Sequence, residues 1–285
     1  MSFQEVIVIG APRSGTNMLR DVLCQIPGFG TWPCDEINYI WRHGNSRWPS
    51  DQFPAELATD AVKRYLNLQF TRRARIDALR YVVEKTCANS LRVPFVDRVL
   101  PGARYLFIHR DAVDAVTSAM RRWQASFDLA YTLKKARFVP WTDIPYYGWR
   151  FVRNRLHRML SRDRRLASWG PRLADMERLA RRHCLAEICA LQWNACVGLA
   201  VQAFAAVPAE RVHVTRYEDF VKAPAAGLRL ICDFLGVEPE PPTLESAVKN
   251  VFDRSVGKGA HELDTSTRER IAALTASARS ALARR

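Results

Sequence analysis

The chain has 285 residues, of which 48% are apolar and 25% are charged, and this is the composition of an ordinary folded protein. It excludes a disordered, collagen-like or repeat-dominated chain. Lysine and arginine outnumber aspartate and glutamate by 43 to 29, which gives a net charge of +14, and 36 of the 43 cations are arginine. Because the guanidinium group binds planar oxyanions through two parallel hydrogen bonds, this excess favours an anionic ligand such as phosphate or sulfate.

The seven cysteines are scattered without metal-like spacing, which predicts free thiols in a reducing compartment. The apolar run at residues 6–9 is too short for a signal peptide. Residues 185–207 form the longest apolar stretch, but four polar side chains interrupt it. We therefore expect a buried core helix there rather than a membrane span, in a cytoplasmic protein.

Three strand–loop–helix units follow one another along the chain. Residues 5–10 form a short β-rich run, followed by a turn and by apolar residues at helical spacing. A second unit spans residues 104–125, and a third begins at 211–214 and ends in a helix that Gly236 stops. Strands that alternate with helices predict an α/β fold with a central parallel sheet, in which the loops after the strands meet at one edge.

Residues 131–185 differ from the rest of the chain in charge. They hold 14 lysines and arginines against 4 acidic residues, and so carry +10 of the net +14, and they are rich in aromatic residues. We expect a single domain over residues 1–285, with this basic, aromatic-rich segment as an insert or cap. The residues after 265 predict a polar helix.

The first loop, residues 10–17 (GAPRSGTN), has two glycines at the spacing of a phosphate-binding P-loop. Backbone N–H groups and the helix N-terminus can surround an anion there. A nucleotide triphosphatase carries Lys-Ser/Thr where this chain has Thr16-Asn17, and the cation lies inside the loop instead, at Arg13. This pattern favours transfer of a group that needs no Mg²⁺ bridge. A plain glycine-containing turn stays open as the alternative.

The second loop, residues 109–118, places Arg110 at the end of a strand and Asp114 and Ser118 on one face of the next helix. Arg110 and Ser118 could hold one phosphate together. The alternative is an exposed helix that is capped by Asp111.

The segments APRSGTNMLRDVL and RYLFIHRDAVDAVTSAMRRW resemble the 5′-phosphosulfate loop and the 3′-phosphate motif of sulfotransferases that use 3′-phosphoadenosine 5′-phosphosulfate (PAPS). The likeness continues in Glu84-Lys85-Thr86, in VTRYEDFVKAPAAGLRLICDFLGV and in a late loop at residues 254–260. Carbohydrate, tyrosylprotein and bacterial enzymes are the most similar, since the cytosolic drug and steroid type usually has lysine in place of Arg13. The resemblance implies a P-loop-like three-layer fold of the sulfotransferase type and no metal.

The resemblance also implies which residues hold the donor PAPS and its product adenosine 3′,5′-bisphosphate (PAP). For the 5′-phosphosulfate they are Arg13, Ser14, Gly15, Thr16 and Asn17. For the 3′-phosphate they are Arg110 and Ser118. The late-loop residues Ser255, Gly257 and Lys258 lie where the loop of the family closes over the cofactor. The late loop departs from the family in Gly259-Ala260, where an aromatic residue is common.

Sulfuryl transfer to a hydroxyl needs in-line geometry, cations near the moving group and a general base. We expect Arg13 and Lys85 as the catalytic cations. Glu36 lies where tyrosylprotein and some bacterial sulfotransferases carry an acceptor-side glutamate, and Glu84 matches the glutamate that supplies the base in heparan-type enzymes. Both remain open as the base, and His109 is a third candidate.

Aromatic residues after the first helix and in the insert suit a sugar ring or an aromatic acceptor, or else pack under a loop. We expect the hydroxyl of a carbohydrate or glycolipid of a bacterial surface polymer, with a tyrosine of a secreted peptide as the alternative. The lack of the membrane anchor that animal Golgi relatives carry favours a bacterial cytoplasmic enzyme. Residues 149–160 predict a helix with an apolar stripe and an arginine-rich side, which suits either core packing or peripheral contact with an anionic inner membrane.

Two other classes of function compete with this interpretation. The absence of the Lys-Ser/Thr pair argues against a P-loop nucleotide kinase or triphosphatase. Apolar residues at helical spacing interrupt the basic segment, which argues against a nucleic-acid-binding module. We therefore expect no nucleic-acid partner, and the sequence predicts no oligomeric state.

Overall fold

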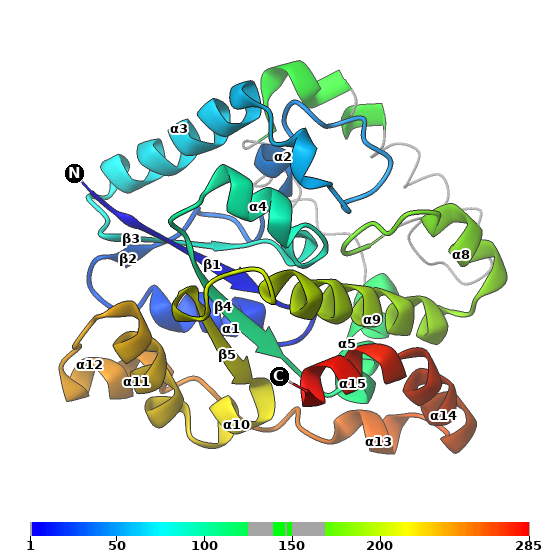
Figure 1. Cartoon of the computed structure of the whole chain (residues 1–285). Coiled ribbons are helices and arrows are strands. Elements are labelled where there is room, and N and C mark those ends of the chain that lie inside the picture. The colour runs from blue at the N-terminus through cyan, green and yellow to red at the C-terminus, as the bar shows by residue number, and fades with distance from the viewer. Residues whose placement is uncertain (1, 125–138, 146, 150–168, 285) are drawn as a thin grey trace.

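The computed structural model describes residues 2–124, 139–145, 147–149 and 169–284 (Figure 1). Within these residues the core is a parallel sheet of five strands in the order β2-β3-β1-β4-β5. The strands are β1 (Gln4–Ile9), β2 (Phe29–Gly30), β3 (Tyr81–Lys85), β4 (Arg104–His109) and β5 (Val212–Arg216). The predicted α/β class with a central parallel sheet is confirmed.

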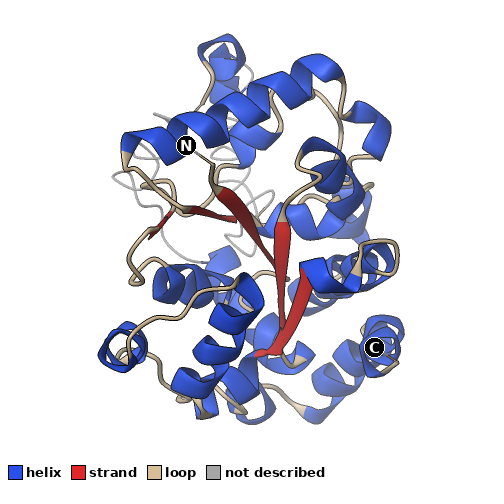
Figure 2. Cartoon of the chain, turned by 60° about the vertical axis from the view of Figure 1, so that its left-hand side comes forward, coloured by secondary structure: helices blue, strands red, loops and turns tan. Residues whose placement is uncertain are grey.

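Helices cover both faces of the sheet (Figure 2). Those in the first half of the chain are α1 (Thr16–Leu23), α2 (Asn38–Trp41), α3 (Asp60–Ile76), α4 (Val93–Val99) and α5 (Ala112–Gln124). Those in the second half are α8 (Met176–Arg182), α9 (Leu185–Phe204), α10 (Tyr217–Lys222), α11 (Pro224–Leu235), α12 (Pro241–Val248), α13 (Lys258–Glu262), α14 (Thr265–Leu274) and α15 (Ala276–Ala283). Short 3-10 helices lie at Ala55–Leu57, Cys87–Leu91, Trp141–Asp143 and Ala209–Arg211.

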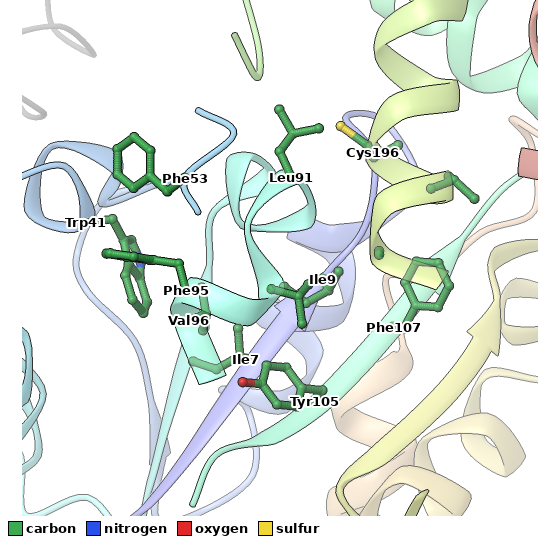
Figure 3. Packing of buried hydrophobic residues seen from close by; sticks show 14 of the residues in the cluster. Ile7, Ile9, Trp41, Phe53, Leu91, Phe95, Val96, Tyr105, Phe107 and Cys196 are labelled. Carbon is green, nitrogen blue, oxygen red and sulfur yellow. The ribbon is translucent and has the colours of Figure 1, made fainter. Parts of the chain in front are cut away.

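Alternate residues of the central strands enter two separate cores, because successive side chains of a strand point to opposite faces. Ile7 and Phe107 pack on one face with residues of α3, α4, α5 and α9. Figure 3 shows both residues with Phe95 of α4 and Cys196 of α9. Val8 and Leu106 pack on the other face with residues of α1, α10, α11 and α12. The three layers explain why β1 is apolar at every position from 6 to 9, since both of its faces are covered.

The long apolar stretch forms α9, and the prediction of a core helix is confirmed. Its polar side chains bind segments that pack against it: Gln192 donates to the carbonyls of Trp169 and Pro171, both at 2.9 Å, and Asn194 Oδ1 accepts from the backbone N–H of Ala278 at 3.1 Å. None of the described helices is long and apolar enough to cross a membrane.

Two parts of the sequence prediction need correction. Strand β3 lies beside β1 but was not predicted, because its apolar part is only Tyr-Val-Val before Glu84 and Lys85. The segment after residue 265 forms two helices rather than one polar helix, and Ile271 and Ala278 are buried in the same core as α9. The helix expected over residues 149–160 lies outside the described residues, apart from Trp149.

Candidate active site

The loop of residues 10–17 lies between β1 and α1 and packs closely against β4 and α10. Gly15 has φ 89° and Arg13 has φ 70°, so the loop turns through the left-handed region twice. A Cβ at Gly10 would lie 2.4 Å from the carbonyl oxygen of Ile108, and a Cβ at Gly15 would lie 2.5 Å from the ring of Tyr217. Both glycines therefore allow the loop to approach the neighbouring β4 and α10, and α1 begins directly after Gly15.

The first and second loops meet as the sequence predicts. The Nε group of Arg13 donates to the hydroxyl of Ser118 at 2.9 Å, and Arg110 donates to the carbonyl of Arg13 at 3.2 Å. Arg13 is exposed, and partial desolvation together with the nearby charges of Arg122 and Arg110 lowers its pKa. Such a gathering of cations is the electrostatic setting of an anion site.

Two buried polar atoms at this site have no hydrogen-bond partner in the described structure. They are the hydroxyl of Ser14, which is fully buried, and the Nε group of Arg110. Thr16 is also buried, and its hydroxyl lies 3.6 Å from the Cys87 sulfur, whereas Asn17 is half-buried. These buried donors are therefore available to a bound anion.

The late loop is attached to α5 through Asp114. Its two carboxylate oxygens accept from the backbone N–H groups of Gly257 and Gly259, each at 2.7 Å. Arg110 donates to the carbonyl of Ser255 and also lies 3.5 Å from Asp114. The structure thus places Ser255 beside Arg110 and Gly257 beside Asp114, and the sequence prediction missed the contact of Asp114 with the late loop.

Tyr217 joins all three loops and was also missed. Its ring lies under Gly15, the guanidinium carbon of Arg110 is 4.5 Å from its ring centroid, and its hydroxyl lies 2.7 Å from that of Ser255. By contrast, Lys258 is exposed at the first residue of α13. The useful sequence signal for Tyr217 was its place in the loop after the third predicted strand, since the loops after parallel strands meet at one edge of the sheet.

Arg122 is a third residue that the sequence reasoning missed. It lies four residues after Ser118 on α5, so both belong to one face of that helix, and its charge contributes to the lowered pKa of Arg13. The i, i+4 spacing from Ser118 was the signal that could have found it.

Glu36 and Lys85 form an ion pair on the other side of the first loop. Lys85 Nζ donates to Glu36 Oε1 at 2.9 Å, and the backbone N–H of Cys87 donates to the same oxygen at 3.3 Å. Although burial acts to lower the pKa of Lys85, the adjacent Glu36 carboxylate outweighs it and raises that pKa. Lys85 is therefore held as a cation, and the side chain of Glu36 remains 27% exposed.

Glu84 lies in a different environment from Glu36, although it is adjacent to Lys85 in the sequence. It is 1% exposed, and its carboxylate accepts from the Thr86 hydroxyl at 2.5 Å and from the Asn89 amide at 2.8 Å. Burial raises the pKa of Glu84 to about 7. The structure brings Glu36 to Lys85 and leaves Glu84 inside the protein.

His109, the third candidate, is half-buried with its ring 5.9 Å from that of Phe107, and burial lowers its pKa. The aromatic residues after α1 divide into two groups. Trp32 and Trp41 are core residues, whereas the ring of Tyr39 packs edge-on against Tyr147 of the insert at 4.5 Å. No group of three potential metal ligands is gathered within the described residues.

Comparison with known proteins places this geometry in a family. The profile of the sulfotransferase family matches residues 5–142 and 150–241. No curated protein matches the chain at a significant level. The sulfotransferase domain from the curacin biosynthetic pathway superposes with a TM-score of 0.56 at 15% identity, over 97% of this chain and 99% of that chain.

Two further solved structures show the same fold. A sulfotransferase from Alicyclobacillus acidocaldarius has a TM-score of 0.52 at 18% identity, over 99% of this chain and 95% of that chain. A mouse sulfotransferase complexed with PAP has a TM-score of 0.50 at 13% identity, over 95% and 82%. The structural likeness confirms the predicted P-loop-like fold of the sulfotransferase type, and the family profile covers most of the chain. The chain therefore belongs to the sulfotransferase family and is a sulfotransferase.

Proposed function

We propose that the protein transfers the sulfuryl group of PAPS to a hydroxyl group. The observation that carries this proposal is the convergence of Arg13, Ser118 and Arg110 at the first loop, where partial desolvation and other cations lower the pKa of Arg13. A ligand with anionic groups at both its 5′ and 3′ ends would compensate these charges. The PAP bound to the mouse relative supports the choice of donor.

The residues present fit this donor. The unpaired Ser14 hydroxyl and Arg110 Nε supply buried hydrogen-bond donors, and the N-terminus of α1 supplies backbone N–H groups. We assign the 5′-phosphosulfate to Arg13, Ser14, Gly15, Thr16 and Asn17, and the 3′-phosphate to Arg110 and Ser118. Ser255, Gly257 and Lys258 would close over the donor. PAPS supplies an activated sulfuryl group, so the chain itself provides position and charge.

In the proposed step, the acceptor oxygen forms a bond to sulfur while the bond between sulfur and the 5′-phosphate oxygen breaks. The electron pair of the broken bond stays on the phosphate, and PAP leaves. Arg13 and Lys85 stabilise the charge on the moving group and on the leaving phosphate. Glu36 takes the proton of the acceptor hydroxyl. Its 27% exposure and its ion pair with Lys85 support this role over Glu84, which is only 1% exposed.

For the acceptor we propose a carbohydrate or glycolipid of a bacterial surface polymer, with a tyrosine peptide second. The contact of Tyr39 with Tyr147 supports an aromatic-lined acceptor region that includes the insert. We also propose that a cytoplasmic enzyme meets a lipid-linked acceptor at the inner membrane. Trp141, Ile144 and Trp149 of the insert are 81%, 54% and 67% exposed, which supports an interfacial contact.

The donor is tested by calorimetry with PAP and with adenosine 5′-monophosphate. We expect PAP to bind at least tenfold more tightly, because only PAP carries the 3′-phosphate that Arg110 would hold. Equal affinity for the two nucleotides, or Mg²⁺-dependent turnover of ATP, would contradict the proposal and favour a nucleotide kinase.

The acceptor is tested by incubating the protein and PAPS with glycans, glycolipids and tyrosine peptides. We expect sulfate in a glycan or glycolipid, and sulfate in a peptide alone would select the second candidate. Sedimentation with anionic liposomes at low salt tests the membrane contact, and no sedimentation would contradict that part of the proposal.

A further inference from the structure

Two hydrogen-bonded paths lead from Glu84 to the residues directly after Glu36. On the first path, Glu84 Oε1 accepts from the Thr86 hydroxyl at 2.5 Å, and Thr86 Oγ1 accepts from the backbone N–H of Ile37 at 3.3 Å. Thr86 is fully buried. The backbone next to Glu36 is therefore fixed through Thr86 to the carboxylate of Glu84.

The second path reaches the next residue along the chain. Glu84 Oε2 accepts from the Asn89 amide at 2.8 Å, and Asn89 Oδ1 accepts from Arg92 Nε at 2.9 Å. Arg92 Nη2 then donates to Asn38 Oδ1 at 2.6 Å. Asn89 and Arg92 are fully buried, and Asn38 is the first residue of α2. The two paths thus end at Ile37 and Asn38.

We propose that Glu84 is a positioning residue that fixes Glu36 against Lys85. This inference rests on the proposed function, in which Glu36 is the general base. The direction of donation in this network is fixed at its ends, because the guanidinium group of Arg92 and the backbone N–H of Ile37 can only donate. Because Asn89 must accept from Arg92, its amide group must donate to Glu84, and Glu84 must accept at both oxygens. Glutamine offers only one side-chain oxygen, so Glu84→Gln leaves one donor of the network without its acceptor.

The test measures PAP release from PAPS at pH 8, first with water as the acceptor and then with the best hydroxyl acceptor of the screen. We expect Thr86→Val to lower kcat about tenfold or more, because small misplacement of a reacting group is costly. The KM for PAPS and the affinity for PAP should change less than twofold. Thr86→Ser keeps the hydroxyl and should restore most of the rate.

Thr275→Val is the matched control, since it also removes a fully buried threonine hydroxyl, which donates to the carbonyl of Ile271 at 2.8 Å in the C-terminal helices. It should leave kcat unchanged. In the Glu36→Gln background, Thr86→Val should have no further effect on kcat, because a residue that acts only through Glu36 has nothing left to position. Asn38→Ala, at a half-buried residue, tests the second path and should lower kcat in the same way.

The outcomes separate the two proposals. Wild-type protein that fails to bind PAP contradicts the proposed function. Intact PAP binding together with wild-type kcat in both Thr86→Val and Asn38→Ala overturns the positioning role alone. Loss of transfer in Glu84→Gln while Glu36→Gln keeps its rate would also overturn it, and would make Glu84 the base. If Thr86→Val does not fold, Asn38→Ala decides.

Discussion

The cations on the proposed donor side of the site, Arg13 and Arg110, and the cation on the proposed acceptor side, Lys85, differ in their hydrogen-bond partners. On the donor side, Arg13 donates to a serine hydroxyl and Arg110 donates to backbone carbonyls, while Asp114, the nearest carboxylate to Arg110, already accepts from two backbone N–H groups. On the acceptor side, Lys85 is paired with Glu36 at 2.9 Å. Arg110 lies 3.5 Å from Asp114, but Arg13, Arg110 and Arg122 together leave an excess of positive charge that favours an anion, whereas a balanced pair suits a neutral hydroxyl that must lose a proton. The comparison supports the places proposed for the donor and the acceptor.

The largest effect should come from the acceptor side. We expect Glu36→Gln to lower kcat by about 10²- to 10⁴-fold, the usual contribution of a general base, with PAP affinity preserved. Asp35→Asn is the control, since it changes the adjacent carboxylate, which lies 3.6 Å from Arg20. Steady-state kinetics with PAPS and the best acceptor measures both. A Glu36→Gln variant with wild-type turnover would contradict the role of Glu36 as the base, and His109 would be tested next.

On the donor side, Arg110→Ala should weaken PAP binding about 10- to 100-fold, because a hydrogen bond to a charged group contributes about 1.5–3 kcal/mol. Arg104→Ala is a matched control at the opposite end of β4: Arg104 also lies over an aromatic ring and donates to a backbone carbonyl. Calorimetry should show unchanged PAP affinity for Arg104→Ala. Equal losses in both variants would mean that Arg110 acts through stability and not through phosphate.

The pH dependence of stability sharpens the contrast between Glu84 and Glu36. The pKa of Glu84 is raised by burial to about 7, against an ordinary 4.5, although Lys85 and Arg92 act to lower it. The folded state therefore binds this proton more tightly, and stability falls as pH rises between 4.5 and 7, on the order of 2 kcal/mol. Denaturant unfolding at pH 5 and pH 7.5 should show this loss in the wild type and a smaller one in Glu84→Gln. Identical pH profiles of stability would disprove it.

The smallest expected effect concerns the late loop. Asp114→Asn removes one of the two oxygens that accept from Gly257 and Gly259, so we expect a loss of about 1–2 kcal/mol in unfolding free energy. The loop should also be cleaved faster by trypsin after Arg254 and Lys258. Asp111→Asn, which changes a neighbouring carboxylate that accepts from the N–H of Asp114, is the control. Unchanged cleavage in Asp114→Asn would show that other contacts hold the loop.

Part of the site could be predicted because parallel sheets place loops at one edge. Arg13 and Ser118 are far apart in the sequence, yet the strand–loop–helix pattern was enough to bring them together. The choice between Glu36 and Glu84 could not be made in this way. Burial of Glu84 depends on Asn89 and on the path to α2, which are tertiary contacts without a local pattern. The contact of Asp114 with the late loop was missed for the same reason.

Helix α9 has a consequence for how the protein is made. Its apolar surface is covered on one side by α14 and α15, and Asn194 binds the backbone N–H of Ala278 there. During synthesis α9 leaves the ribosome before these helices exist, because a chain emerges from its N-terminus. For that interval the nascent chain exposes a long apolar surface. Packing of α14 and α15 on α9 then buries this surface. A chain stalled on the ribosome before these helices would keep the apolar surface of α9 exposed to chaperones.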